Sequence, residues 1–299
     1  MKSRRNWHDL GELLKQGQER LKKAGIQEYE LDAWYLFEQA FSMSRARYFL
    51  DAKEEAAPEA PALKAYENGL ERRSGRVPLQ HILGTQEFMG MEFFVNAHVL
   101  IPRQDTETLV ETVLNEQKNR NISVLDMCTG SGCIAVSLKA LGGYARVAAA
   151  DISSEALEVA EKNAGTYPVE FRQSDMFAAF EPGRDMFDVI VSNPPYIPAQ
   201  VIDGLEPEVR DHEPRLALDG DQDGLKFYRI LAAECMARLK PGGAVYMEIG
   251  YDQGEEVTKL FDKAGFKDLE VIRDMAGLDR VVRAIRPPQQ ENGAENGRR

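Results

Sequence analysis

Apolar and polar positions follow helical spacing through the first part of the chain. Within residues 6–50 the apolar side chains return every three or four positions, as on one face of a helix, and Gly17 interrupts the pattern. Residues 51–61 are charged and proline-rich, which indicates a solvated loop, and residues 62–73 again have helical spacing. The pattern predicts a small helical domain over residues 1–75.

The character of the sequence changes between residues 77 and 99. Aromatic and β-branched residues gather there around Gly84 and Gly90, a composition that favours a β-hairpin. We therefore expect residues 76–100 to form a β-hairpin linker between two domains.

From residue 106 onward, strand-like and helix-like segments alternate. The strand-like runs cover residues 123–127, 146–150, 169–173, 187–192, 243–249, 267–273 and 279–285. The helical patterns cover residues 106–118, 133–141, 154–164, 224–239 and 253–264. Such alternation predicts an α/β fold with a doubly wound, mostly parallel sheet, here over residues 101–286. Residues 287–299 are almost without apolar side chains, which predicts a disordered tail.

Composition narrows the class of protein. Of 299 residues, 43% are hydrophobic and 29% charged, as in globular proteins. No apolar run approaches the roughly 20 residues that cross a bilayer, so we expect a cytoplasmic protein without a membrane partner. The three cysteines are spaced too irregularly for a disulfide framework or a zinc site, and we expect no metal.

The distribution of charge bears on nucleic acid. The net charge is −12, and residues 1–75 carry equal numbers of basic and acidic side chains, so the negative excess lies in the remainder. Such a surface repels duplex DNA unless a local basic patch overrides it. We expect no direct, sequence-specific binding of nucleic acid.

A glycine-containing loop follows the strand at 123–127. Cys128, Thr129, Gly130, Ser131 and Gly132 stand between that strand and a helix N-terminus, where the backbone can approach a ligand closely. A plain tight turn is the alternative.

An acidic residue ends the next strand. Asp151 follows the loop at about 20 residues, the spacing of a carboxylate that accepts ribose hydroxyls. It could instead cap the following helix. We assign Asp151 and the adjacent Ile152 to a cofactor site.

The loop favours S-adenosylmethionine over a dinucleotide. It lacks the G-x-G-x-x-G turn that holds a pyrophosphate, and Asp126 before it would repel a phosphate. After the third strand, Asp175 can meet the adenine amino group and Met176 the adenine ring, although Met176 could equally be core.

The strongest chemical signal follows the strand at 187–192. Asn193, Pro194, Pro195 and Tyr196 would lie at the carboxyl edge of the sheet, where α/β folds bind ligands. The prolines stiffen the loop and remove N–H donors, so it offers oxygen atoms.

An oxygen-lined pocket suits a neutral amino nucleophile. Its hydrogens can donate to the side-chain oxygen of Asn193 and the backbone oxygen of Pro194, which steers the lone pair toward a sulfonium methyl group. We assign Asn193, Pro194 and Tyr196 to catalysis, with Pro195 as a further substrate contact and Asn193 also beside the cofactor. Tyr196 could stack on a planar substrate group.

The Asn-Pro-Pro-Tyr loop resembles that of the amino-methyltransferases, which act on exocyclic amines of DNA bases or on glutamine amides. More of the chain is similar to one branch, the release-factor glutamine methyltransferases (the PrmC/HemK family). The matching stretches are residues 78–84, 88–90, 99–103, 105–107, 126–132, 193–198, 213–215, 217–218 and 223–225.

The resemblance implies a seven-stranded class I methyltransferase domain of Rossmann-like fold with a helical front domain that docks the substrate. It implies methyl transfer from S-adenosylmethionine to the side-chain amide N5 of the glutamine in the Gly-Gly-Gln motif of peptide-chain release factors. Two positions depart from the family pattern. Cys128 stands where glycine is common, so we expect the turn to be made there without a positive φ, and Gln104 stands where proline is common.

Three alternatives stay open at this point. One is a ribosomal-protein glutamine methyltransferase of the same branch. A DNA adenine-N6 methyltransferase would need a base-flipping pocket and a target-recognition domain, and no basic insertion of that kind is evident. A binding module without activity would have no use for the intact loop at Asn193–Tyr196.

Overall fold

The computed structural model describes residues 10–51 and 60–289. The chain divides into two compact units, one comprising Met1–Thr85 and Glu206–His212, the other Gln86–Leu205 and Glu213–Arg299. The first unit thus continues past residue 75, where we placed the end of the helical domain. Most of the loop expected at 51–61, and of the tail expected at 287–299, lies outside the described residues.

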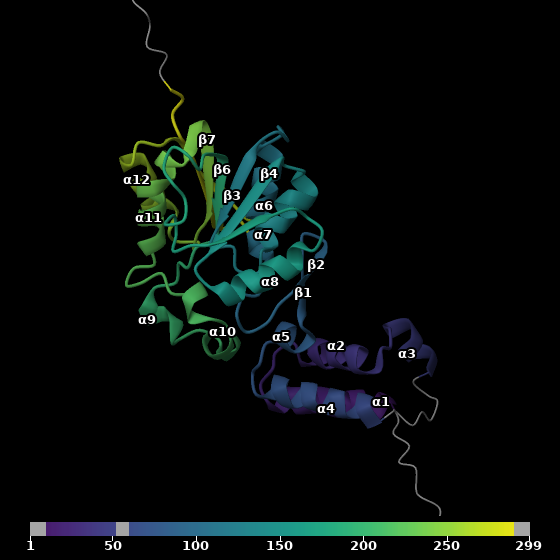
Figure 1. Cartoon of the computed structure of the whole chain (residues 1–299). Helices are drawn as coiled ribbons and strands as arrows, with labels where there is room; N and C mark the ends of the chain where they lie inside the picture. The colour runs from purple at the N-terminus through teal and green to yellow at the C-terminus, as the bar shows by residue number, and fades with distance from the viewer. Residues whose placement is uncertain (1–9, 52–59, 290–299) are drawn as a thin grey trace, which may run out of the picture. The chain divides into compact units, whose positions relative to one another are not determined.

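The first unit is helical, as the sequence predicts (Figure 1). Its helices are α1 (Leu10–Lys23), α2 (Tyr29–Phe41), α3 (Arg45–Asp51), α4 (Ala60–Ser74), α5 (Leu79–Leu83) and α10 (Pro207–His212). They enclose a core that includes Leu21, Phe37 and Tyr66. Gly17 does not interrupt α1. A Cβ atom there would lie 2.0 Å from the hydroxyl oxygen of Tyr66, so this glycine lets α4 pack closely against α1.

Ion pairs that are largely shielded from solvent attach α10 to the rest of the first unit. The guanidinium of Arg73 bonds to Asp32 at 2.6 Å and to Glu208 at 2.8 Å, and Arg76 contacts Glu208 at 2.7 Å. Such a network forms only when both partners are held in place, since an unpaired buried charge is costly. The segment Glu206–His212 therefore belongs to the helical unit although it is far away in sequence.

The expected hairpin is shorter than the linker we assigned. Strands β1 (Thr85–Phe88) and β2 (Met91–Phe94) form a two-stranded sheet, and α5 occupies part of the stretch before them. Met89 and Gly90 both have positive φ, 53° and 71°, as a tight two-residue hairpin turn requires.

The second unit is a seven-stranded sheet, which confirms the predicted α/β fold. Its strands are β3 (Ser123–Met127), β4 (Arg146–Asp151), β5 (Glu170–Gln173), β6 (Phe187–Ser192), β7 (Leu239–Glu248), β8 (Lys267–Arg273) and β9 (Asp279–Ile285). The spatial order is β5-β4-β3-β6-β7-β9-β8, and β9 runs in the direction opposite to the other six strands.

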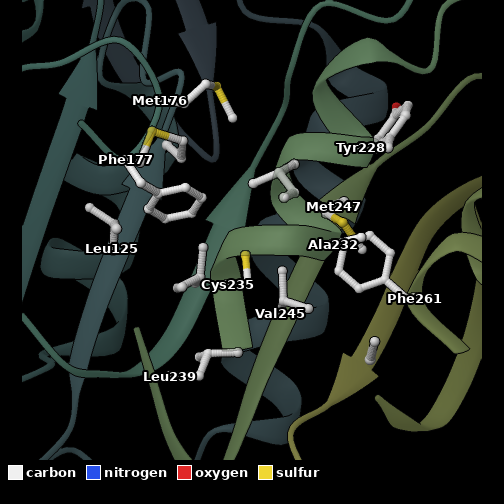
Figure 2. Packing of buried hydrophobic residues seen from close by; sticks show 14 of the residues in the cluster. Leu125, Met176, Phe177, Tyr228, Ala232, Cys235, Leu239, Val245, Met247 and Phe261 are labelled. Carbon is white, nitrogen blue, oxygen red and sulfur yellow. The ribbon is translucent and has the colours of Figure 1, made fainter. Parts of the chain in front are cut away.

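Helices cover both faces of this sheet (Figure 1). One face carries α6 (Gln104–Glu116), α7 (Cys133–Ser137), which continues into a π-helical turn, and α8 (Ser154–Ala164). The other carries α11 (Lys226–Glu234) and α12 (Gly254–Lys263). In Figure 2, Tyr228 and Ala232 of α11 pack together with Val245 and Met247 of β7. The segment between β6 and α11, for which the sequence pattern predicts no helix, contains α9 (Ala199–Ile202), α10 and a 3₁₀ turn at Arg215–Ala217.

The strand order fixes where a ligand can bind. From β3 the chain passes to β4 and β5 on one side and then returns to β6 on the other, so the order reverses between β3 and β6. Ligands of open α/β sheets bind at the carboxyl ends of the strands at this point. Met127 and Ser192, the last residues of β3 and β6, are direct neighbours in the sheet, and the Ser192 hydroxyl donates to the Met127 carbonyl at 2.7 Å.

Candidate functional site

A cavity of about 530 Å³ lies at this edge of the second unit. Its size falls in the range of small-molecule sites. Ten predicted site residues line it: Cys128, Thr129, Gly130, Ser131, Asp151, Ile152, Asp175, Met176, Asn193 and Pro195. Gly132, Pro194 and Tyr196 are not among the lining residues.

The side chain of Asp126 holds the glycine loop, residues 128–132, in place. This carboxylate, fully buried at the end of β3, accepts hydrogen bonds from the Thr129 hydroxyl at 2.6 Å and the Ala135 N–H at 3.2 Å. Burial raises the pKa of Asp126 to about 7. Gly132, which begins α7 with φ 79°, faces α8, where a Cβ atom would lie 2.9 Å from the Ala160 side chain. Asp126 and Gly132 thus shape the loop from outside the cavity.

Asp151 closes the loop from the neighbouring strand. Its Oδ2 accepts from the Gly130 N–H at 2.9 Å and its Oδ1 from the Ser153 N–H at 3.0 Å. The helix cap is Ser153, whose hydroxyl accepts from the Ala156 N–H. Burial raises the pKa of Asp151, while the bonds from Ser153 and Gly130 oppose that shift. Asp151 therefore does not serve as the N-cap that we considered.

The expectation for Cys128 is wrong. Its φ is 65°, so the turn has the left-handed geometry that glycine adopts freely. A non-glycine residue there costs about 1–2 kcal/mol. The neighbouring bonds enforce the turn, since the Thr129 N–H donates to the Ala150 carbonyl at 3.0 Å and the Gly132 N–H to the Thr129 carbonyl at 2.8 Å. The Cys128 thiol lies 3.8 Å from the sulfur of Met176.

Asp175 and Met176 follow β5 at the same edge of the sheet. Met176 is almost fully buried, belongs to the core cluster drawn in Figure 2, and also lines the cavity. The interpretation of Met176 as a core residue is thus confirmed, and its contact with an adenine ring stays a prediction. Its φ of 45° is fixed by Ser174, whose hydroxyl donates to the Met176 carbonyl at 2.6 Å.

Asn193 presents its amide to the cavity in one orientation. The side-chain nitrogen donates to the Thr106 hydroxyl oxygen at 3.3 Å. No donor among the described residues bonds to the side-chain oxygen, which is left to accept a hydrogen bond from the cavity. Asn193 can therefore act as an acceptor for a substrate N–H.

The rest of the loop is packed rather than open. Pro194 and Pro195 are buried. The Tyr196 hydroxyl donates to Glu248 at 3.1 Å, and burial beside that carboxylate raises the pKa of Tyr196. Tyr196 therefore contacts the interior, and its stacking on a substrate stays a prediction.

A second layer supports the backbone of this loop. Gln253 donates to the Tyr196 carbonyl at 3.0 Å. Gly224 lies directly behind it, since a Cβ atom there would be 2.3 Å from the same carbonyl oxygen. Backbone bonds between Ile197 and the segment 218–220 complete the support.

Sequence reasoning missed two polar residues of the site, Thr106 and Glu248. Thr106 lies in the first turn of α6, is buried and lines the cavity. Glu248 ends β7 and is buried beneath the Asn193–Tyr196 loop. The sequence signal that could have identified Glu248 is a carboxylate at the carboxyl end of a central strand. Arg103, which also lines the cavity, forms an ion pair with the buried Glu213.

The described residues contain no helix long and apolar enough to cross a membrane. Within the same part of the chain, no three His, Cys, Asp or Glu residues gather in a group that could hold a metal ion.

Comparison with known proteins agrees with this geometry. Residues 12–84 match the PrmC N-terminal domain, and residues 103–204 match the methyltransferase small domain. The crystal structure of a methyltransferase from Pyrococcus furiosus aligns with 73% of this chain and 99% of its own, with a TM-score of 0.51 and 17% identity, a likeness of fold alone.

Two curated relatives are much closer in sequence. The release factor glutamine methyltransferase of Caulobacter vibrioides is 43% identical over 90% of this chain and 94% of its own. That of Moorella thermoacetica is 42% identical over 93% of this chain and 97% of its own. Identity of this extent, through both units, shows that the chain belongs to the release factor glutamine methyltransferase family.

Proposed function

We propose that this protein transfers a methyl group from S-adenosylmethionine to the side-chain amide N5 of the glutamine in the Gly-Gly-Gln motif of peptide-chain release factors. The observation that carries the proposal is the Asn193 amide, whose oxygen is free to accept a hydrogen bond at the edge of a cofactor-sized cavity. The names of the curated relatives support the substrate class.

The chemistry of the cavity fits S-adenosylmethionine. The carboxylate of Asp151 can accept ribose hydroxyls, and Asp175 with Met176 can receive an adenine. The loop at Gly130 brings backbone close to the ligand with no side chain in between. The Asp151 side chain, which lines the cavity, also favours a cation over a phosphate. When bound, the cofactor supplies a methyl group on a positively charged sulfur.

Asn193 positions the nucleophile. A glutamine amide nitrogen has two hydrogens, and donating one to Asn193 Oδ1 fixes its orientation. The second can reach the Pro194 carbonyl oxygen, as the stiff loop suggests. As the nitrogen becomes positive, both oxygens stabilise the charge, each contributing about 1.5–3 kcal/mol. Holding the reactants in line contributes more, up to about 7–11 kcal/mol in ideal cases.

Mass spectrometry tests the proposal. The protein is incubated with an intact release factor and S-adenosylmethionine carrying a labelled methyl group, and the labelled peptide is sequenced. We expect one methyl group on the glutamine of the Gly-Gly-Gln motif. Asn193→Ala should lose most transfer and keep its affinity for the cofactor. Label on another residue, or on ribosomal protein instead, would reject the proposed substrate.

A further inference from the structure

The wall of the cavity is rich in sulfur. Four of the residues that line it carry a sulfur atom: Met127, Cys128, Cys133 and Met176. Two of these sulfur atoms are in contact, since the thiol of Cys128 lies 3.8 Å from the thioether of Met176. In Figure 2, Met176 lies at the upper edge of the core cluster, and both residues of the pair line the cavity. A ligand in the cavity therefore meets a thiol and a thioether side by side.

The backbone holds both residues of this sulfur pair in fixed positions. Cys128 has a φ of 65° and Met176 a φ of 45°, both in the left-handed region. Beside Cys128, the Thr129 N–H donates to the Ala150 carbonyl at 3.0 Å. The Met176 carbonyl accepts from the Ser174 hydroxyl at 2.6 Å. Strained backbone of this kind gathers at sites that hold ligands, and here it makes the pair a preorganised unit.

The spacing of the two sulfur atoms suits a metal ion. Metal–thiolate bonds are about 2.3 Å long. An ion at that distance from both sulfur atoms, which are 3.8 Å apart, would have a sulfur–metal–sulfur angle of about 110°. Thiolate and thioether ligands together select Cu⁺. A structural Zn²⁺ site needs four ligands, whereas the described residues offer no group of even three His, Cys, Asp or Glu.

The charge of the cavity wall favours a cation. Three acidic residues line the cavity, Asp151, Glu155 and Asp175. Carboxylates in a cleft raise the local concentration of positive ions. Arg103 and Lys226 also line the cavity, but each forms an ion pair with a carboxylate that lies outside the lining. A soft monovalent cation therefore meets both suitable ligands and a suitable field.

We propose that Cys128 and Met176 form a binding site for a soft monovalent cation, Cu⁺, and that an ion bound there excludes the cofactor. One bond forms between the ion and the Cys128 sulfur, whose proton passes to solvent, and a second forms to the Met176 sulfur. No electron is transferred, so binding needs neither an oxidant nor a reductant. The exclusion rests on the proposed function, because it requires S-adenosylmethionine to occupy this cavity. The metal site does not depend on it.

Two variants each remove one donor of the pair. Met176→Leu replaces the thioether with an apolar group of similar volume, and Cys128→Ser replaces the thiol with a hydroxyl. The matched controls are Cys133→Ala and Met275→Leu, which each remove one sulfur atom outside the pair. Cys133 lines the same cavity, whereas Met275 is fully exposed.

Anaerobic titration of each reduced, full-length protein against the coloured complex of Cu⁺ with bicinchoninate measures the affinity for Cu⁺ alone. The unchanged protein should bind one Cu⁺ at its tightest site. We expect Cys128→Ser to weaken this binding roughly a hundredfold and Met176→Leu roughly tenfold, because each loses one of two soft donors. Both controls should stay within about twofold on the same ground. Wild-type affinity in Met176→Leu, or an equal loss in Cys133→Ala, would refute the two-sulfur site.

Calorimetry tests the exclusion. The affinity for S-adenosylmethionine is measured with and without one equivalent of Cu⁺. We expect Cu⁺ to weaken cofactor binding at least roughly tenfold in the unchanged protein, and by linkage the cofactor should weaken Cu⁺ binding by the same factor. Equal cofactor affinity in the two measurements would overturn the exclusion. Methyl transfer to a release factor in the absence of metal decides the proposed function separately, so the two proposals can fail independently.

Discussion

Asp151 bonds to its own loop and also reaches the wall of the cavity where we propose that the cofactor binds. It accepts the Gly130 N–H and the Ser153 N–H, and it also lines the cavity. We expect Asp151→Ala to weaken S-adenosylmethionine binding by about 1–3 kcal/mol, because ribose hydroxyls lose their acceptor. Calorimetry measures this directly. Asp151→Asn, which keeps one acceptor oxygen, should lose less, and an unchanged affinity in the alanine variant would refute the ribose role.

Cys128 tests whether backbone geometry at the first loop position matters for binding. With φ at 65°, the position favours glycine and strongly disfavours β-branched residues. Cys128→Val should therefore bind S-adenosylmethionine much more weakly than Cys128→Gly, although valine resembles cysteine more in size. Titration of both purified variants decides the point. Equal affinities would mean that the loop adapts and that its positive φ is incidental.

At the scale of elements, the loop at Asn193–Tyr196 depends on the close approach of Gly224. A Cβ atom there would lie 2.3 Å from the Tyr196 carbonyl oxygen, and φ is 73°. Gly224→Ala should displace the loop and slow methyl transfer roughly tenfold or more. Gly183→Ala is the matched control, because its φ of 77° is similar and nothing lies within 4 Å. Equal rates for the two alanine variants would show that backbone strain, and not the clash with Tyr196, causes the loss of methyl transfer.

The sheet could be predicted from sequence because its central strands are buried on both faces. Mostly apolar runs such as Phe187–Ser192 differ clearly from the helical spacing of the segments between them. The glycine loop and Asp151 could also be predicted, because each stands at the end of such a strand. The left-handed turn at Cys128 could not, since it arises from hydrogen bonds to Ala150 and within the loop.

The short helices and the buried polar contacts could not be predicted from the sequence. Helix α10 has six residues, too few to be stable alone, and it is held by Arg73 and Arg76 from another part of the chain. The hydrogen bonds of Asn193 with Thr106 and of Tyr196 with Glu248 join segments that are distant in sequence. Only the register of α6 and β7 against β6 brings these residues together.

Across the whole molecule, stability should depend on pH through Asp126 and Glu248. Burial raises the pKa of each to about 7, above its ordinary value. A raised pKa means that the folded state holds protons which the unfolded chain releases, so stability is lost as pH rises from about 4 through 7. For Asp126 the loss is roughly 2–4 kcal/mol. Urea unfolding at pH 5 and pH 8 should show a smaller difference in Asp126→Asn than in wild type. Parallel curves for the two proteins would contradict this.

We expect the helical unit to influence which substrates the protein accepts. Its ion pairs hold the segment Glu206–His212, which ends two residues before the cavity-lining Pro214 in the sequence. A glutamine on a loop offers the cavity few contacts, whereas a stable protein interface needs about 800 Å² per partner. We therefore expect the helical unit to supply most of the remaining contact with an intact release factor.

Removing that unit should separate binding from chemistry. A chain that begins at Gln86 keeps every residue that lines the cavity, so it should bind S-adenosylmethionine with near wild-type affinity, which also verifies that it folds. With an intact release factor its KM should rise by roughly a hundredfold, equivalent to about 3 kcal/mol of lost contact. With a short Gly-Gly-Gln peptide, which cannot reach the helical unit, kcat/KM should change little. If the full-length and shortened proteins methylate the intact factor with equal KM, the helical unit does not dock the substrate. Specificity would then reside in the cavity and its rim, because those are the contacts that both proteins share.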